Sequence, residues 1–446
     1  MGKNPIARLT TYLPLRVHTA MLFGLTMLIG LVFSIIGVTC LLQTDLQAQE
    51  GTRAAEIEKA RAAKAAQLKP EEVSKAEGWS SRFRDKKFLE RFSQGFNGIR
   101  AKIGNMVTGG GFAIGPEYAR EDLLKGRLNF RTAAQVSTRG FYKIDNQWTL
   151  PRLAGNKVSL DFYTVHHDYA SISYYGPGPD STKGGRADYR LEDTSTEATG
   201  VFTPVRGLAI GGTVGALWMN IGPGNDRRFI SADRIFTEAQ SPGIQNQTNF
   251  FRYGVFLQHD TRSSPIAAKA GRNIVFQYTW FDDRKLNIHN FRRIDAEIQQ
   301  YIPILNRSRV FALRAKTVLT EANGKETAPF YLQPLLGGSD DLRGFRPFRF
   351  SDRDMVVFNA EYRWEIFGGL DGALFVDAGK VFSRRGQLNF SNLESSYGFG
   401  LRGNARNATF LRLDVGFSHE GFQIWLKFND VFAQRRFGAE IAQPVF

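Results

Sequence analysis

Cysteine, histidine and long apolar runs are scarce in this chain of 446 residues. The single cysteine, Cys40, excludes a disulfide bond within the chain. Only residues 20–42 form a nearly unbroken apolar run, and the mean hydropathy is −0.28. A protein built from many membrane helices would be far more hydrophobic. A β-barrel fits these values, because its apolar residues alternate with polar ones and its average resembles that of a soluble protein.

Recognisable catalytic and metal-binding patterns are also missing. The sequence contains no Gly-x-Ser-x-Gly elbow, so a serine hydrolase of that type is excluded. The six histidines are scattered, and their only cluster, His166-His167-Asp168, would point to opposite faces of a strand. The glycine groups 109–111 and 222–224 lack the strand-to-helix context of a phosphate loop. We therefore predict no enzymatic activity, no catalytic residues, no metal and no cofactor.

The chain is basic, with a formal net charge of +15. Its Lys and Arg residues are spread along the whole sequence and form no basic cluster interleaved with aromatic residues. This distribution argues against nucleic-acid binding. A basic lumen, or contact with anionic lipid head groups, accounts better for the charge.

The first 48 residues have the features of an export signal. Lys3, Arg8 and Arg16 precede the apolar run, and small residues follow it near Ala48. Because the run is long enough to cross a bilayer, an uncleaved inner-membrane anchor is the alternative. Lipidation at Cys40 is a weaker alternative, because Thr39 suits a lipoprotein cleavage site poorly.

Residues 49–97 differ in character from the rest. Ala, Glu, Lys and Arg dominate 54–68, which suits a short exposed helix ended by Pro70. The charged stretch 82–92 carries several Phe residues on one side. We interpret 49–97 as a polar, partly helical periplasmic linker. An amphipathic segment that plugs the barrel or docks a partner is the alternative.

From about residue 98 the hydrophobic period becomes two. Apolar residues alternate with polar residues or glycine in 208–218, 273–280, 411–418 and 422–428. A soluble sandwich also alternates, but long strands, aromatic residues near strand ends and the export signal favour a membrane protein. We predict an all-β fold in which 98–432 form a transmembrane antiparallel barrel of about 16 strands. An even count would let every strand edge pair on closure.

The loops between these strands alternate between short and long. Turns at 153–156 and 203–206 are tight, whereas 174–185, 222–249 and 321–353 are long. Short turns suit the periplasmic side of an outer-membrane barrel, and long loops suit the outer side. The third long loop would then be extracellular and lie between the eleventh and twelfth strands.

This third loop carries the most informative residues of the chain, Leu342-Arg343-Gly344-Phe345, preceded by Leu336-Gly337-Gly338-Ser339. An arginine inside a barrel is costly unless an acid neutralises it. Asp377, in Phe375-Val376-Asp377-Ala378-Gly379, and Glu361 both fall on the polar faces of their strands. An exposed loop arginine is the alternative.

Together these motifs resemble the BamA/TamA-type outer-membrane barrels, the bacterial surface antigen superfamily. The resemblance covers about 98–432 and includes 109–118, 359–364, 397–402 and 411–414. It implies that the loop is a lid folded into the lumen, with its motif at Gly337, Gly338, Leu342, Arg343, Gly344 and Phe345. Arg343 would pair with Asp377, with Glu361 adjacent, and Gly344 would allow the tight turn that aims the arginine.

The chain departs from that family in two ways. Residues 49–97 are too few for the periplasmic polypeptide-transport-associated domains, and 433–446 extend beyond the last strand. The resemblance implies a location in the outer membrane of a Gram-negative-type bacterium, among its lipids and lipopolysaccharide. The implied role is inserting or translocating client polypeptides, with a periplasmic partner supplying the missing domain. A passive channel and a structural scaffold remain alternatives.

Overall fold

The computed structural model describes residues 59, 97–264, 267–305, 308–324, 326–405, 408–428, 430 and 432. Apart from Lys59 and Asn97, the expected signal and linker lie outside these residues, as does the extension 433–446. The chain divides into two compact units, Met1–Ser74 and Lys75–Phe446, and every described strand belongs to the second. Among the described residues, no helix is both long and apolar enough to cross a membrane.

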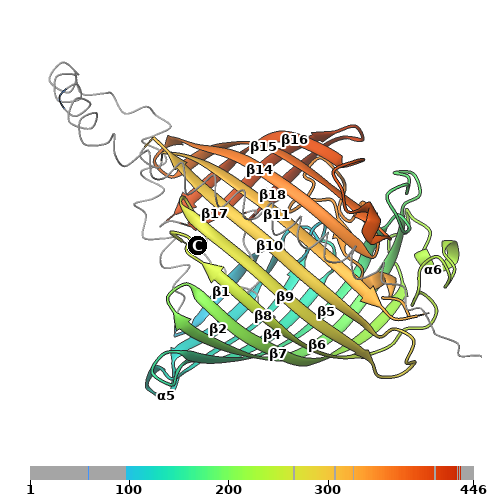
Figure 1. Cartoon of the computed structure of the whole chain (residues 1–446), viewed down its shortest axis with the longest axis horizontal. Helices are drawn as coiled ribbons and strands as arrows, with labels where there is room; N and C mark the ends of the chain where they lie inside the picture. Colours follow the sequence, from blue (N-terminus) through green and yellow to red (C-terminus); the bar gives the residue numbers. More distant parts are fainter. Residues whose placement is uncertain are drawn as a thin grey trace, which may run out of the picture. The chain divides into compact units, whose positions relative to one another are not determined.

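The described part of the second unit is one antiparallel sheet of sixteen strands in chain order (Figure 1). The strands are β1 (Ile99–Gly104), β2 (Ala113–Asp122), β3 (Leu128–Ser137), β4 (Tyr142–Leu153), β5 (Val158–Tyr174), β6 (Ala187–Val205), β7 (Leu208–Pro223), β8 (Phe250–Asp260), β9 (Gly271–Asp283), β10 (Phe291–Ile304), β11 (Arg309–Ala322), β14 (Asp354–Phe367), β15 (Leu370–Phe382), β16 (Glu394–Ala405), β17 (Ala408–Ser418) and β18 (Gly421–Lys427). The sheet is rolled into a nearly closed barrel, which confirms the predicted fold.

Short elements occupy the connections. They are α5 (Leu123–Gly126), α6 (Ala232–Ile235), η1 (Phe330–Leu332), η2 (Arg385–Gln387) and a two-stranded ladder of β12 (Leu335–Leu336) with β13 (Phe350–Ser351).

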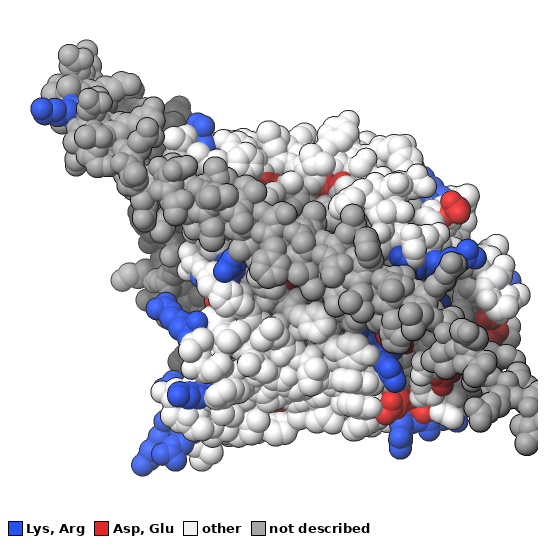
Figure 2. Space-filling model, in the orientation of Figure 1, with Lys and Arg blue, Asp and Glu red and all other residues white. Residues whose placement is uncertain are grey.

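The alternation along each strand separates an apolar outer face from a polar inner face. In β7, Ile210 and Trp218 are 45% and 47% exposed, whereas the inward Thr213 is buried. In β18, Phe422 and Ile424 point outward in the same way. On the face drawn in Figure 2, the described surface is mostly uncharged, with most Lys, Arg, Asp and Glu toward the two ends. Such a surface suits lipid contact along the strands and water at both rims.

The first and last strands approach each other without a ladder among the described residues. Phe112, beside β2, and Phe428, just after β18, place their rings 5.6 Å apart. The expectation that every edge pairs on closure therefore does not hold in this part of the chain. Beyond Lys427, Asp430 and Phe432 are buried against the inner wall.

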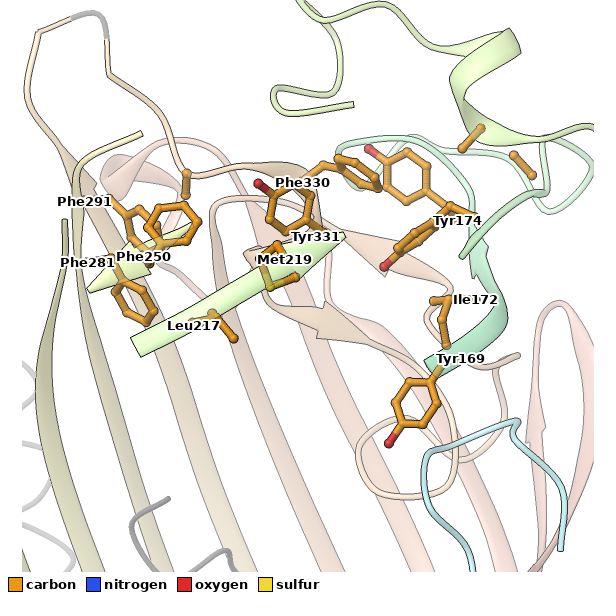
Figure 3. Close-up of a cluster of buried hydrophobic side chains, with 14 of the residues drawn as sticks. Tyr169, Ile172, Tyr174, Leu217, Met219, Phe250, Phe281, Phe291, Phe330 and Tyr331 are labelled. Carbon is orange, nitrogen blue, oxygen red and sulfur yellow. The ribbon is translucent and has the colours of Figure 1, made fainter. Parts of the chain in front are cut away.

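An apolar cap lies at the end of the barrel that carries the long loops (Figure 3). We define it as the buried cluster of Phe141, Tyr169, Ile172, Tyr174, Ala187, Tyr189, Leu217, Met219, Ala232, Phe250, Phe281, Phe291, Ala328, Phe330 and Tyr331. The Phe330 ring, from η1, lies 5.1 Å from Tyr174 and 5.0 Å from Tyr189. The cap therefore joins a loop to inward-facing residues at the ends of β5 and β6.

Candidate functional site: the lid loop and its anchorage

The lid loop, residues 323–353, connects β11 to β14, which are the eleventh and twelfth strands of the sheet. Its β12–β13 ladder forms a narrow neck, in which Leu336 pairs with Phe350. Beyond the neck, Leu342 and Phe345 are both fully buried. They belong to a cluster with inward residues of β11, β14 and β15, namely Val318, Met355, Val357 and Val381. The tip of the loop is therefore packed against the inner wall of the barrel.

Two glycines set the path of the chain into the lumen. Gly337 and Gly338 both have φ of +111°, a conformation that side-chain-bearing residues rarely adopt. The N–H of Phe345 donates to the carbonyl of Leu342 at 3.1 Å and closes a turn around Arg343 and Gly344. This turn directs the arginine toward the wall formed by β14–β18.

Arg343 and Asp377 form a two-pronged ion pair. Nε and Nη2 of Arg343 donate to the two oxygens of the Asp377 carboxylate at 3.0 and 2.7 Å. The backbone N–H of Arg343 donates to the same carboxylate at 3.1 Å. Both side chains are 0% exposed, so the pair is shielded from the solvent expected in a water-filled lumen.

Glu361 lies beside this pair and has closer partners of its own. Its Oε2 is 3.6 Å from Nη1 of Arg343, and it also accepts hydrogen bonds from Arg363, at 3.2 Å, and from Arg402. Asp414 lies 3.9 Å from the same Nη1. Burial by itself would lower the pKa of Arg343, but the charges of Asp377 and Glu361 outweigh burial and raise that pKa. The guanidinium therefore stays protonated.

The turn is also held through an aromatic ring and its backbone. The Arg343 guanidinium lies 3.4 Å from the centroid of the Phe375 ring, a cation–π contact. The indole N–H of Trp425 donates to the Arg343 carbonyl at 2.8 Å, and the Ser418 hydroxyl donates to the Gly344 carbonyl at 2.9 Å. The anchorage thus reaches β15, β17 and β18.

Gly344 lies in the expected tight turn, but its φ is not positive. Glycine is needed there because a Cβ would lie 2.5 Å from the carbonyl oxygen of Phe417. Gly416 faces it from β17, and a Cβ at that position would lie 2.4 Å from the Arg343 carbonyl oxygen. The absence of two side chains allows the loop backbone to lie directly against the wall.

Comparison with known proteins places the chain in a family. Residues 129–424 match the model of the Omp85 superfamily domain. The chain belongs to the Omp85 superfamily. This confirms the resemblance to BamA/TamA-type barrels, and as an Omp85 barrel the protein lies in the outer membrane of a Gram-negative bacterium.

Solved structures share the fold of this Omp85 barrel. BamA from Haemophilus ducreyi, lacking POTRA domains 1–3, is 15% identical with a TM-score of 0.55, over 74% of this chain and 69% of BamA. CdiB from Escherichia coli is 11% identical with a TM-score of 0.54, over 74% of this chain and 62% of CdiB. No curated protein matches the sequence.

Sequence reasoning missed several residues that hold the lid loop of this Omp85 barrel. Arg412 donates to the Ser339 carbonyl at 3.0 Å and to Asp340 at 2.9 Å. Asn359 donates to the Asp341 carbonyl at 2.7 Å and to Asp377 at 2.8 Å. The sequence pattern could have indicated both residues, because each is a polar residue at an inward-facing position of its strand, Asn359 in β14 and Arg412 in β17. Within the described ranges, no group of three or more His, Cys, Asp or Glu side chains is placed to hold a metal ion.

Proposed function

We propose that this Omp85 barrel inserts or translocates polypeptides at the outer membrane. The observation that carries the proposal is the anchored turn of the lid loop. Burying Arg343 and Asp377 is costly unless the pair has good geometry, and in this barrel we infer that the pair specifies one arrangement of the loop among several. The anchorage joins the loop to β15, β17 and β18, so a movement of the loop would be coupled to these last strands of the barrel. Such coupling suits a barrel that handles polypeptides.

The passive-channel alternative requires a continuous aqueous path, as in large porins. The buried lid tip and the apolar cap both favour an obstructed lumen. In planar bilayers we expect the intact protein to give small, irregular conductance. Deleting residues 337–350 should enlarge and steady the conductance, with retained gel mobility before boiling as the check on folding. A large, stable conductance that the deletion leaves unaltered would favour a passive channel.

Depletion in cells tests the polypeptide function itself. We expect loss of the protein to lower the amounts of particular outer-membrane proteins, measured by quantitative proteomics of purified outer membranes. An Arg343→Ala gene should restore them poorly, whereas Arg228→Ala, at an exposed loop arginine, should restore them fully. Proteins that co-purify with the barrel would identify a periplasmic partner. If depletion changes no client, a scaffold role becomes the better account.

A further inference from the structure

Two residues beyond the last strand, Asp430 and Phe432, lie inside the barrel. Asp430 and Phe432 are 3% and 2% exposed. They contact inward-facing side chains of β10, β11 and β14, and three strands separate β14 from β18 in the sheet. Ala268, in the β8–β9 turn, belongs to the same cluster, which places the contact at the short-turn end. We expect this end to face the periplasm.

The Asp430 carboxylate is held by a guanidinium fork. Nη1 and Nη2 of Arg363 lie 3.0 and 3.4 Å from its two oxygens, and both side chains are largely buried. Oδ1 of Asp430 also accepts the N–H of Phe432 at 2.9 Å, so the acid shapes the turn that directs the ring. A two-pronged guanidinium contact of this kind fits a carboxylate or a phosphate, and among unmodified side chains of a polypeptide it selects a carboxylate.

The Phe432 ring lies in a pocket on the inner wall. The ring centroid is 6.3 Å from that of Tyr301, and Cζ atoms of Arg314 and Arg363 lie 5.9 and 5.5 Å from it. Val310 and Ala312 complete the apolar lining. Gln299 donates to the Phe432 carbonyl at 3.0 Å, and so contacts the backbone of the occupant.

We propose that this inner-wall pocket is a peptide-recognition site for an acidic residue followed two positions later by an aromatic residue. Asp430 and Phe432 are its resident occupant. The contacts read a carboxylate, a backbone carbonyl and a ring, and none of them depends on the covalent link to β18. The inference deepens the proposed function and rests on it for the ligand class, a segment of a polypeptide.

Tethering gives the resident segment an effective concentration on the order of millimolar, so it competes strongly with any segment in trans. Removing the side chains of Asp430 and Phe432 should therefore make the pocket accessible to a peptide added in trans. The test uses the full chain in detergent micelles, with a double variant, Asp430→Ala and Phe432→Ala. The probe is a fluorescent peptide with the sequence of residues 428–434, followed by fluorescence anisotropy. We expect the double variant to bind the probe about tenfold more tightly than the wild type or more.

Controls separate recognition from non-specific loosening. Phe390→Ala, at a 68% exposed loop ring, should bind the probe as the wild type does. Replacing the probe's acid by Asn, or its second Phe by Ala, should abolish binding to the double variant. Arg363→Gln in the double variant should also abolish it. Because Arg363 also contacts Glu361, Gln299→Ala provides a second wall variant, which should weaken binding without disturbing that ion pair.

The proposal is overturned if the double variant, folded by its gel mobility, binds the probe no better than the wild type. It is equally overturned if the acidic and Asn probes bind alike. Client depletion is scored separately. If loss of the barrel lowers client proteins but the double variant does not bind the probe, the pocket proposal is rejected and the proposed function stands. If the double variant binds the probe but loss of the barrel changes no client protein, the pocket proposal stands and the proposed function is rejected.

Discussion

The lid anchorage and the apolar cap fill the same barrel by different physical means. The anchorage is built from charges: Arg343, fully buried, meets Asp377 and Glu361 on a wall formed by the later strands. The cap is built from rings and aliphatic side chains on β5–β10, the long loops and the β3–β4 turn (Figure 3). Ion pairs depend on direction and on both partners, whereas apolar packing depends on area and volume.

This difference determines how each region should fail. Removing one member of a buried ion pair leaves an uncompensated charge, so the loss is steep and strongly coupled to the partner. Removing part of an apolar side chain leaves a cavity that its neighbours partly fill, so the loss is graded. We therefore expect single substitutions in the anchorage to cause large losses of stability, and substitutions in the cap to cause losses that grow with the volume removed.

The largest effect is expected for Asp377→Ala. It leaves the Arg343 guanidinium buried without its main partner, which costs about 3–5 kcal/mol for a pair of this kind. The lid loop should become sensitive to protease, and the urea midpoint of the detergent-folded barrel should fall. Adding Arg343→Met should recover part of the loss, because it removes the stranded charge. Asp226→Ala, at a pair whose arginine is 67% exposed, should cost at most about 1 kcal/mol. Equal losses at the two sites would contradict the comparison.

A smaller loss is expected for Gly416→Ala, which tests the close approach of loop and wall. The new Cβ would lie 2.4 Å from the Arg343 carbonyl oxygen, and a backbone atom cannot move aside as a flexible side chain can. Overpacking of this kind costs about 1–3 kcal/mol. Gly200→Ala is the matched control, because its nearest neighbour is a Leu160 methyl at 3.5 Å. Equal urea midpoints for the two variants would show that the lid backbone does not rest on β17.

The barrel fold could be predicted from the sequence, because alternation with a period of two recurs in many strands and each strand repeats the same signal. The resemblance also named Arg343, Asp377 and Glu361 together, and these side chains lie in contact in the structure, while their role in function stays a prediction. The remaining anchorage was hidden because Trp425 and Ser418 act on backbone carbonyls, which no residue pattern marks. The glycine requirement at Gly344 came from the distance to Phe417, and sequence shows no such distance.

A graded loss is expected in the cap for Phe330→Leu. The Phe330 ring touches Tyr174, Tyr189 and Tyr331, and leucine would keep most of this apolar contact. The expected cost is on the order of 1 kcal/mol, as for moderate changes of shape in a packed core. Phe330→Ala should cost more, in step with the cavity it leaves. The urea midpoints of both variants test the trend. A loss for Phe330→Leu as steep as that for Asp377→Ala would remove the distinction between the regions.

The smallest expected effect is a dependence on pH at Asp340, which lies in the lid loop. Its carboxylate accepts a hydrogen bond from Arg412 at 2.9 Å, and its side chain is 38% exposed. Burial would raise the pKa of Asp340, but the charges of Lys427 and Arg412 outweigh burial and lower that pKa. The stabilising contribution is therefore present above the unfolded pKa, about 4, and is lost as pH falls through the lower folded value.

Solvent screening keeps this contribution small, at about 0.5 kcal/mol. The measurement is the difference in urea midpoint between the wild type and Asp340→Asn at several pH values, which cancels the other carboxylates. We expect a constant difference from pH 7 to pH 5 and a decline below about pH 4, where the acid of the unfolded wild-type chain takes up its proton before that of the folded protein. The Arg412 partner keeps its charge throughout this range, because guanidinium groups do not titrate there. A difference that persists unchanged at pH 3 would mean that asparagine disturbs the loop by its shape and not by its lost charge.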